Sequence, residues 1–133
     1  MTRNRAIIIT PWEPASNQLR ETITRTLRES DIEVLEPRMS TSSLPYAITR
    51  GIESSDFVVA DVSQQNPNVM YELGLAHGLK KPTILLVDRK SNAIPSDLVG
   101  SLFVVYDSED PDSLQDTLRR RLRQFAQGPL VAS

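Results

Sequence analysis

Short apolar runs alternate along the chain with longer stretches in which apolar and polar residues are mixed. Such runs, rich in β-branched residues and without a polar interruption, are typical of strands that are covered on both faces of a parallel sheet. They lie at Ala6–Thr10, Ile32–Leu35, Phe57–Ala60, Thr83–Val87 and Leu102–Tyr106. The pattern therefore predicts five strands separated by helices or turns.

Three of the intervening stretches carry apolar residues at helical spacing, which predicts amphipathic helices. The stripes are Leu19, Ile23 and Leu27; Leu44, Ile48 and Ile52; and Leu114, Leu118, Leu122 and Phe125. A further helix is predicted after Asn66-Pro67, because Asn caps free amides and Pro suits the first helical position. We expect this helix to end near Lys80-Lys81, where cations meet the negative end of its dipole.

Five parallel strands joined by right-handed crossovers predict an α/β three-layer sandwich with helices on both faces. We expect a flavodoxin-like strand order, 2-1-3-4-5, whose topological switch lies between the first and third strands. The loops Thr10–Ser16 and Asp61–Asn66 are then expected to wall a ligand crevice. One domain is predicted over residues 1–127, with a polar loop at Arg38–Ser43, a short helical turn between Asp88 and Gly100, and a flexible tail at 128–133.

Composition narrows the possible chemistry. The 133 residues include no cysteine and one histidine, and their net charge is -2. The small net charge gives no electrostatic reason to expect a nucleic acid or a membrane as partner. With no cysteine and a single histidine, a zinc site is disfavoured. We expect no metal and no cofactor. The apolar run Ala6–Ile9 is too short for a signal peptide, so we expect a cytoplasmic protein.

Two carboxylates are predicted at the carboxyl ends of the strands, where open α/β sheets bind ligands. Asp61 follows the third strand, and Glu72 lies in the helix after Asn66-Pro67. Two acids close together have pKa values pushed apart, which suits one as nucleophile and the other as proton donor. We expect their carboxyl groups ~5 to 6 Å apart, as in retaining glycosidases. The structural alternative is that Asp61 caps a turn and Glu72 interacts with the helix dipole.

The stretch Val59–Pro82, VADVSQQNPNVMYELGLAHGLKKP, resembles the nucleoside 2-deoxyribosyltransferases and the nucleotide N-glycosidases related to them. Tyr71-Glu72-Leu73-Gly74 matches the motif of that group letter for letter. The later stretches Ile94–Leu98 and Val104–Asp107 resemble TIR-like predicted nucleotide-binding proteins of the same superfamily. The resemblance implies that Glu72 is the nucleophile and Asp61 the second acid.

This resemblance implies an N-glycosidase or N-glycosyltransferase acting on a nucleoside, a nucleotide or an NAD-like molecule. Relatives carry a Gly-rich turn after the first strand, whereas this chain has Thr10-Pro11-Trp12-Glu13-Pro14, which lacks amide donors for a phosphate. The alternative is a nucleotide-binding or sensing module without turnover. The resemblance also implies a homodimer, with the second or third helix in the interface.

Other side chains near the expected crevice are candidates for substrate binding. They are Trp12, which is suited to stack on a base, and Ser63, Asn66, Asn68 and Tyr71. Each has a structural alternative, because polar residues at a helix start are usually caps and a lone tryptophan is often packed.

Three further features are interpreted as structural. His77 is about 140° around the helix from Glu72 and is expected to pack or face solvent. Gly74 and Gly78 suggest close packing of their helix against the sheet or a partner helix. The arginines of the last helix are interpreted as a solvated face rather than a nucleic-acid patch. They are Arg119, Arg120, Arg121 and Arg123.

Overall fold

The computed structural model describes residues 4–36, 44–91 and 103–126. In chain order the elements are β1 (Arg5–Ile9), a 3-10 turn η1 (Pro14–Ser16), α1 (Asn17–Glu29), β2 (Glu33–Leu35), α2 (Leu44–Ser54), β3 (Phe57–Asp61), α3 (Pro67–Gly78), β4 (Thr83–Asp88), β5 (Phe103–Tyr106) and α4 (Pro111–Ala126). The alternation of strands and helices is the predicted one.

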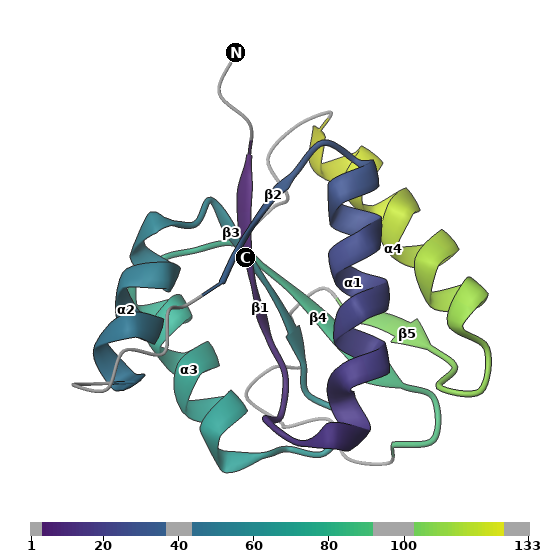
Figure 1. Ribbon diagram of the computed structural model, residues 1–133, viewed down its shortest axis with the longest axis horizontal. Coiled ribbons are helices and arrows are strands. Elements are labelled where there is room, and N and C mark those ends of the chain that lie inside the picture. The colour runs from purple at the N-terminus through teal and green to yellow at the C-terminus, as the bar shows by residue number, and fades with distance from the viewer. Residues whose placement is uncertain (1–3, 37–43, 92–102, 127–133) are drawn as a thin grey trace.

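All five strands are parallel, and their order is β2-β1-β3-β4-β5, which confirms the predicted order 2-1-3-4-5. Helices α1 and α4 cover one face of the sheet, and α2 and α3 cover the other (Figure 1). The carboxyl ends of the strands therefore meet along one edge, close to where α1, α3 and α4 begin.

Two apolar layers hold the helices to the sheet. On one side Ile23 and Leu27 of α1 and Leu118 of α4 pack with Phe57 and Val59 of β3. On the other side lie residues of α2 and α3 together with the alternate residues of the strands. They include Ile48, Ile52, Val69, Leu73, Ala76, Val58, Ala60 and Leu85. The three predicted helical stripes are thus the buried faces, although the side chains of Leu44 and Phe125 lie outside the described residues.

The end of α3 differs from the prediction. The helix stops at Gly78, because Lys80 adopts a left-handed conformation with φ of 59° and the Lys81 amide turns back to donate to the Ala76 carbonyl at 3.0 Å. The Lys81 ammonium donates to the carbonyls of Glu53 (3.0 Å) and Ser55 (2.9 Å). This cation therefore satisfies the carboxyl end of α2 rather than that of its own helix.

Three predictions concern residues outside the described ranges. These are the polar loop at 38–43, the helical turn expected within 92–100 and the tail at 128–133. Within the described ranges, every helix is too short or too polar to cross a membrane.

The packing of α4 on the sheet generates a test of the fold. Leu118 is completely buried, so Leu118→Ala leaves a cavity and is expected to lower the free energy of unfolding by about 2–5 kcal/mol. Val105→Ala on β5, whose side chain is 56% exposed, is the matched control and should cost less than about 1 kcal/mol. Urea denaturation measures both. Equal losses for the two variants would contradict the packing described.

Candidate functional site

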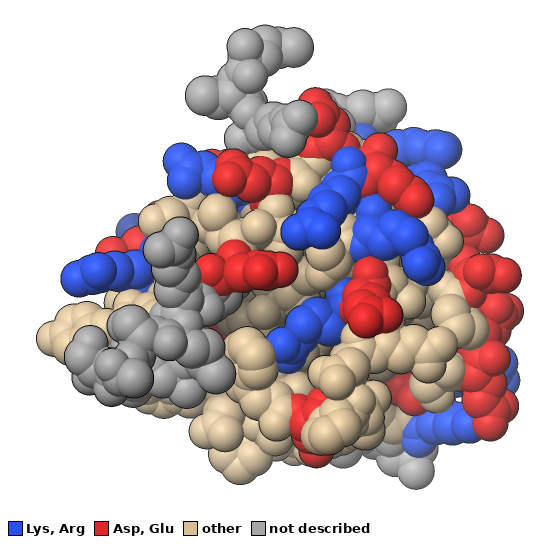
Figure 2. Space-filling model, in the orientation of Figure 1, with Lys and Arg blue, Asp and Glu red and all other residues tan. Residues whose placement is uncertain are grey.

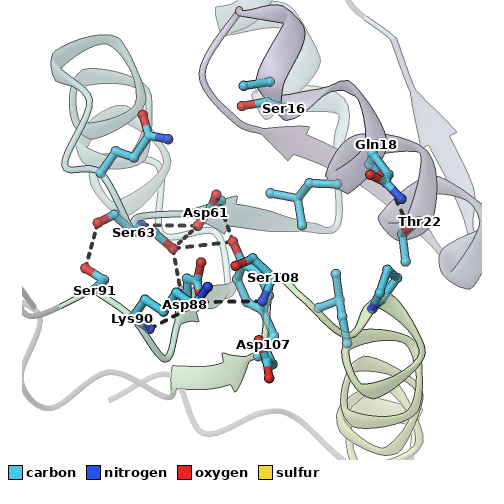
Figure 3. A pocket seen from close by; sticks show the side chains of 16 residues that line it. Ser16, Gln18, Thr22, Asp61, Ser63, Asp88, Lys90, Ser91, Asp107 and Ser108 are labelled. Atoms are coloured by element: carbon cyan, nitrogen blue, oxygen red, sulfur yellow. Dashed lines mark hydrogen bonds between the residues drawn. The ribbon is translucent and has the colours of Figure 1, made fainter.

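A cavity of about 360 Å³ opens at the carboxyl edge of the sheet, between the first turns of α1 and α4 (Figure 3). It is lined by Ala15, Ser16, Gln18, Leu19, Thr22, Asp61, Ser63, Gln64, Asp88, Lys90, Ser91, Tyr106, Asp107, Ser108, Pro111 and Leu114. Both loops predicted from the topological switch contribute to it. The segments after β4 and β5 form the rest of the wall.

Asp61, the last residue of β3, points into this cavity and is held by three hydrogen bonds. One carboxylate oxygen accepts the Ser63 hydroxyl at 2.5 Å and the Ser63 amide at 3.1 Å, and the other accepts the Tyr106 hydroxyl at 3.3 Å. Burial raises the pKa of Asp61, and these hydrogen bonds oppose that rise. The carboxyl group is thus fixed in direction at the wall of the cavity.

Ser63 connects the ends of β3 and β4. Its hydroxyl accepts the Asp88 amide at 2.7 Å while donating to Asp61, and its carbonyl accepts the Ser91 hydroxyl at 2.7 Å. These bonds join the β3–α3 loop to the end of β4. The predicted candidate Ser63 therefore lies in the cavity, where its hydroxyl orients Asp61.

Tyr106 and Asp88 are site residues that sequence reasoning missed. They end β5 and β4 and are paired across the parallel register, so they lie side by side next to Asp61. Burial and the neighbouring Asp61 carboxylate raise the pKa of Tyr106, which keeps its hydroxyl protonated as a donor. Polar residues at the ends of two adjacent parallel strands were the available signal.

Glu72 has a different environment. It lies on the stripe of α3 that packs toward the sheet, together with Val69, Leu73 and Ala76, and is only 8% exposed. Its carboxylate accepts no hydrogen bond from a described residue. Burial raises the pKa of Glu72 to about 7, and the positive charge of Arg20 opposes this rise. A buried carboxylate without a bonded partner is unusual, because glutamates in protein interiors are normally paired.

The Glu72 carboxylate still reaches the surface. No fully buried side-chain oxygen or nitrogen in the described part of the chain lacks a hydrogen-bond partner, so the unbonded oxygens of Glu72 must touch solvent. Glu72 is nevertheless not among the residues that line the Asp61 cavity. The charged neighbour that affects the pKa of Asp61 is Asp88, whereas that of Glu72 is Arg20. The predicted distance between the two acids stays a prediction.

Trp12, in the loop after β1, is 51% exposed and stacks with Arg20, whose guanidinium carbon lies 4.2 Å from the ring centroid. One face of the ring is therefore occupied by a cation. Trp12 and Arg20 also border a second cavity of about 290 Å³ together with Glu36 at the end of β2. Trp12 does not line the Asp61 cavity, so its stacking on a base stays a prediction, while its contact with Arg20 agrees with the packing alternative.

The remaining candidates lie at the start of α3. The Asn66 side chain accepts the amides of Asn68 (2.9 Å) and Val69 (3.2 Å), which confirms its structural interpretation as a helix cap. The side chain of Tyr71 is 70% exposed. His77 is exposed as well, and its ring nitrogen lies 3.3 Å from the Thr83 hydroxyl, away from the site.

Two interpretations of helix surfaces are also tested. A Cβ atom added at Gly74 or Gly78 would meet no described residue within 4 Å, so packing against the described part of the chain does not explain these glycines. Arg119 pairs with Glu29 and Asp116, both at 3.3 Å, in agreement with a solvated face on α4.

Within the described ranges, no group of three or more His, Cys, Asp or Glu side chains is arranged to hold a metal ion.

Known structures share this fold. The chain is similar to the CMP N-glycosidase BcmB of Clostridium botulinum, with 20% identity, a TM-score of 0.67 and coverage of 89% of this chain and 99% of that one. It is similar to a 2-deoxyribosyltransferase of Bacillus psychrosaccharolyticus, with 16% identity, a TM-score of 0.61 and coverage of 84% and 90%. The solution structure of BlsM matches with 16% identity, a TM-score of 0.67 and coverage of 98% of both chains.

No family model matches the sequence, and no curated protein matches it. The structural likeness therefore defines the fold: an α/β sandwich of the kind found in nucleoside 2-deoxyribosyltransferases and CMP N-glycosidase. This is the fold class to which the sequence resemblance pointed.

The burial of Glu72 predicts a pH-dependent stability. Its folded pKa of about 7 lies above the ordinary value of 4.5, so its contribution to stability is present below pH 4.5 and is lost as pH rises through 7. Relative to Glu72→Gln, the wild-type protein should lose about 2–3 kcal/mol of unfolding free energy between about pH 5 and pH 8.

Urea denaturation at several pH values measures this difference. The exposed Glu21→Gln on α1 is the matched control, and its curve should run parallel to that of the wild type. Parallel curves for the wild type and Glu72→Gln would show that the carboxylate is not desolvated.

Proposed function

We propose that the protein cleaves or transfers the N-glycosidic bond of a nucleoside or a related nucleotide, with Glu72 as the nucleophile. The observation that carries the proposal is the environment of Glu72. Its carboxylate lies on an apolar helix stripe, has no hydrogen-bond partner among the described residues and has a pKa near neutrality. The fold shared with N-glycosyl hydrolases and transferases supports the same reaction class.

The chemistry requires a carboxylate beneath the anomeric carbon. As the base departs, positive charge develops on the sugar, and an ionised Glu72 stabilises this charge and attacks the carbon to form a glycosyl ester. Water then releases the sugar, or a second base accepts it. An ionised oxygen without competing hydrogen bonds is the better nucleophile, which favours Glu72 over Asp61 for this role.

Asp61 is proposed to bind and orient the departing base from the cavity beside it. Burial raises the pKa of Asp61, which favours the protonated form that can donate to the leaving nitrogen. Tyr106, which stays protonated, fixes the direction of that carboxyl group. Ser63 supports this arrangement from the loop. Asn66, Asn68, Tyr71 and Trp12 do not line this cavity and stay candidates for contacts with the rest of the substrate.

An unphosphorylated substrate fits the charges best. The cavity is bordered by Asp61, Asp88 and Asp107, while Lys90, the one cation among the described residues that line it, is engaged by Glu109 at 2.5 Å. The loop after β1 carries two prolines and Glu13 where a phosphate would need amide donors. We therefore place nucleosides ahead of nucleotides and NAD.

Release of the free base tests the proposal directly. Deoxynucleosides, ribonucleosides, nucleoside monophosphates and NAD are incubated with the wild-type protein, Glu72→Gln and the control Glu21→Gln, and the base is quantified by chromatography. The wild type and the control should release base, and Glu72→Gln should lose roughly 10³-fold or more of the rate. If all three proteins bind one of these compounds and none releases its base, the protein is a sensing module and the proposed reaction is wrong.

We also propose that the protein is a homodimer through α3. The exposed residues of this helix include no Lys, Arg, Asp or Glu, and Tyr71 protrudes while Gly74 and Gly78, on the same face, leave open space above their Cα atoms. The lower left part of Figure 2, where α3 lies in Figure 1, is correspondingly mostly uncharged, whereas charged side chains crowd over α1 and α4. Two copies related by a twofold axis would place Tyr71 of one helix over Gly78 of the other.

Sedimentation equilibrium tests the dimer. The expected mass is twice the 14.9 kDa of the chain, and Tyr71→Asp should shift the equilibrium toward single chains while the control Arg25→Ala on α1 does not. A single-chain mass for the wild-type protein at high concentration would refute the interface.

A further inference from the structure

The second cavity, of about 290 Å³, lies between α1 and the edge strand β2. It is lined by Ile8, Trp12, Arg20, Thr24, Val34, Leu35 and Glu36. None of these residues lines the Asp61 cavity, to which α1 contributes other side chains. The volume is close to the roughly 300 Å³ at which small-molecule sites begin. Two separate cavities therefore border α1.

A flat wall of this cavity is formed by the Trp12 ring and the Arg20 guanidinium, whose carbon lies 4.2 Å from the ring centroid. The Arg20 Nε donates to the Thr10 hydroxyl at 3.1 Å, Nη2 donates to the same hydroxyl, and Nη2 lies 3.5 Å from the Pro11 carbonyl. These contacts hold the guanidinium in place, while Trp12 stays 51% exposed. A planar ring can therefore lie against a wall that is already ordered.

The rest of the lining combines an apolar floor with hydrogen-bonding groups. Ile8 and Val34, on adjacent strands, pack against the core but are only partly buried. Among the described residues, the acceptors of Arg20 contact Nε and Nη2, so Nη1 can donate to a ligand. The Glu36 carboxylate lies 3.9 Å from Arg28, which is too long for a hydrogen bond, and its side chain is 79% exposed. It can therefore accept from a ligand.

The charges of the lining favour an uncharged ligand. Its described residues carry one cation, Arg20, and one carboxylate, Glu36, so that an anion meets repulsion from one and a cation from the other. A flat ring for the wall and a hydroxyl for the carboxylate are combined in a ribonucleoside. By analogy, an Asp or Glu that follows the first helix of dinucleotide-binding α/β folds accepts the ribose 2′-hydroxyl.

We propose that this cavity is a second ligand site, which binds an unphosphorylated ribonucleoside with its base against Trp12 and its 2′-hydroxyl donating to Glu36. Arg20 donates from Nη1 to an acceptor atom of the same ligand. The proline-rich loop after β1 lacks the amide donors of a phosphate-binding turn, in agreement with a ligand that carries no phosphate. The inference goes beyond the proposed reaction, which is assigned to Glu72 and Asp61, and does not depend on it.

Trp12 is the only tryptophan of the chain, so its fluorescence reports on this cavity without a label. Adenosine, guanosine, cytidine and uridine are titrated into the wild-type protein. At least one of them should quench the fluorescence to saturation, and its 2′-deoxy counterpart should bind roughly tenfold or more weakly, because a hydrogen bond to a carboxylate is lost. The 5′-monophosphate should bind no more tightly than the nucleoside. Absence of quenching by all four, or tighter binding of the monophosphate, would overturn the proposal.

Glu36→Ala should remove the preference for the ribonucleoside over its 2′-deoxy counterpart. The matched control Glu33→Ala removes an exposed glutamate of β2 that does not line the cavity, and it should keep the preference. Asp61→Asn, or Asp88→Asn if the first variant does not fold, should keep both the quenching and the preference, because these acids line the other cavity. A preference that persists in Glu36→Ala, or quenching that is lost in the Asp61 or Asp88 variant, would contradict the assignment.

The same titration in Glu72→Gln separates this inference from the proposed reaction. If this variant binds with unchanged selectivity while the wild-type protein releases no base, the second site stands and the glycosyl chemistry fails. If base is released through Glu72 while no ribonucleoside quenches Trp12, the reaction stands and the second site fails.

Discussion

The parallel pairing of β1 with β3 is the constraint on which the site depends. Because all five strands run in one direction, every carboxyl end lies at the same edge, and the helices that follow β1 and β3 leave toward opposite faces of the sheet. A crevice must open where these two connections part. Arg20 belongs to the helix that follows β1, and Glu72 to the helix that follows β3.

The site is built from groups that do not favour folding. A carboxylate on the stripe formed by Val69, Leu73 and Ala76 loses hydration without gaining a hydrogen bond within the described chain. Asp61 at the neighbouring strand end has the opposite arrangement, because Ser63 and Tyr106 satisfy both of its oxygens. Glu72 thus has no hydrogen-bond partner among the described residues and Asp61 is oriented, an arrangement that suits the proposed nucleophilic attack beside an assisted leaving group.

Local patterns predicted most of the fold, because the strand runs are buried on both faces and the helix stripes are regular. Asp61 could be placed from the sequence because strand ends in a parallel sheet share one edge, whereas the role of Glu72 came from the family resemblance and stays a prediction. Tyr106 and Asp88 were missed, since their contact with Asp61 depends on the register of β3, β4 and β5. The contacts of Arg20 with Thr10 and Trp12 were not predicted either, because they depend on the tertiary position of the loop after β1. The end of α3 was misplaced because a left-handed Lys80 has no distinctive sequence signal.

The central claim is that Glu72 attacks the sugar, and covalent trapping tests it most directly. A fluorinated analogue of a cleaved nucleoside slows the second step, so the glycosyl-enzyme accumulates and mass spectrometry of proteolytic fragments locates the sugar. The account predicts a glycosyl ester on Glu72. An ester on Asp61, or base release with no covalent intermediate on any carboxylate, would contradict it.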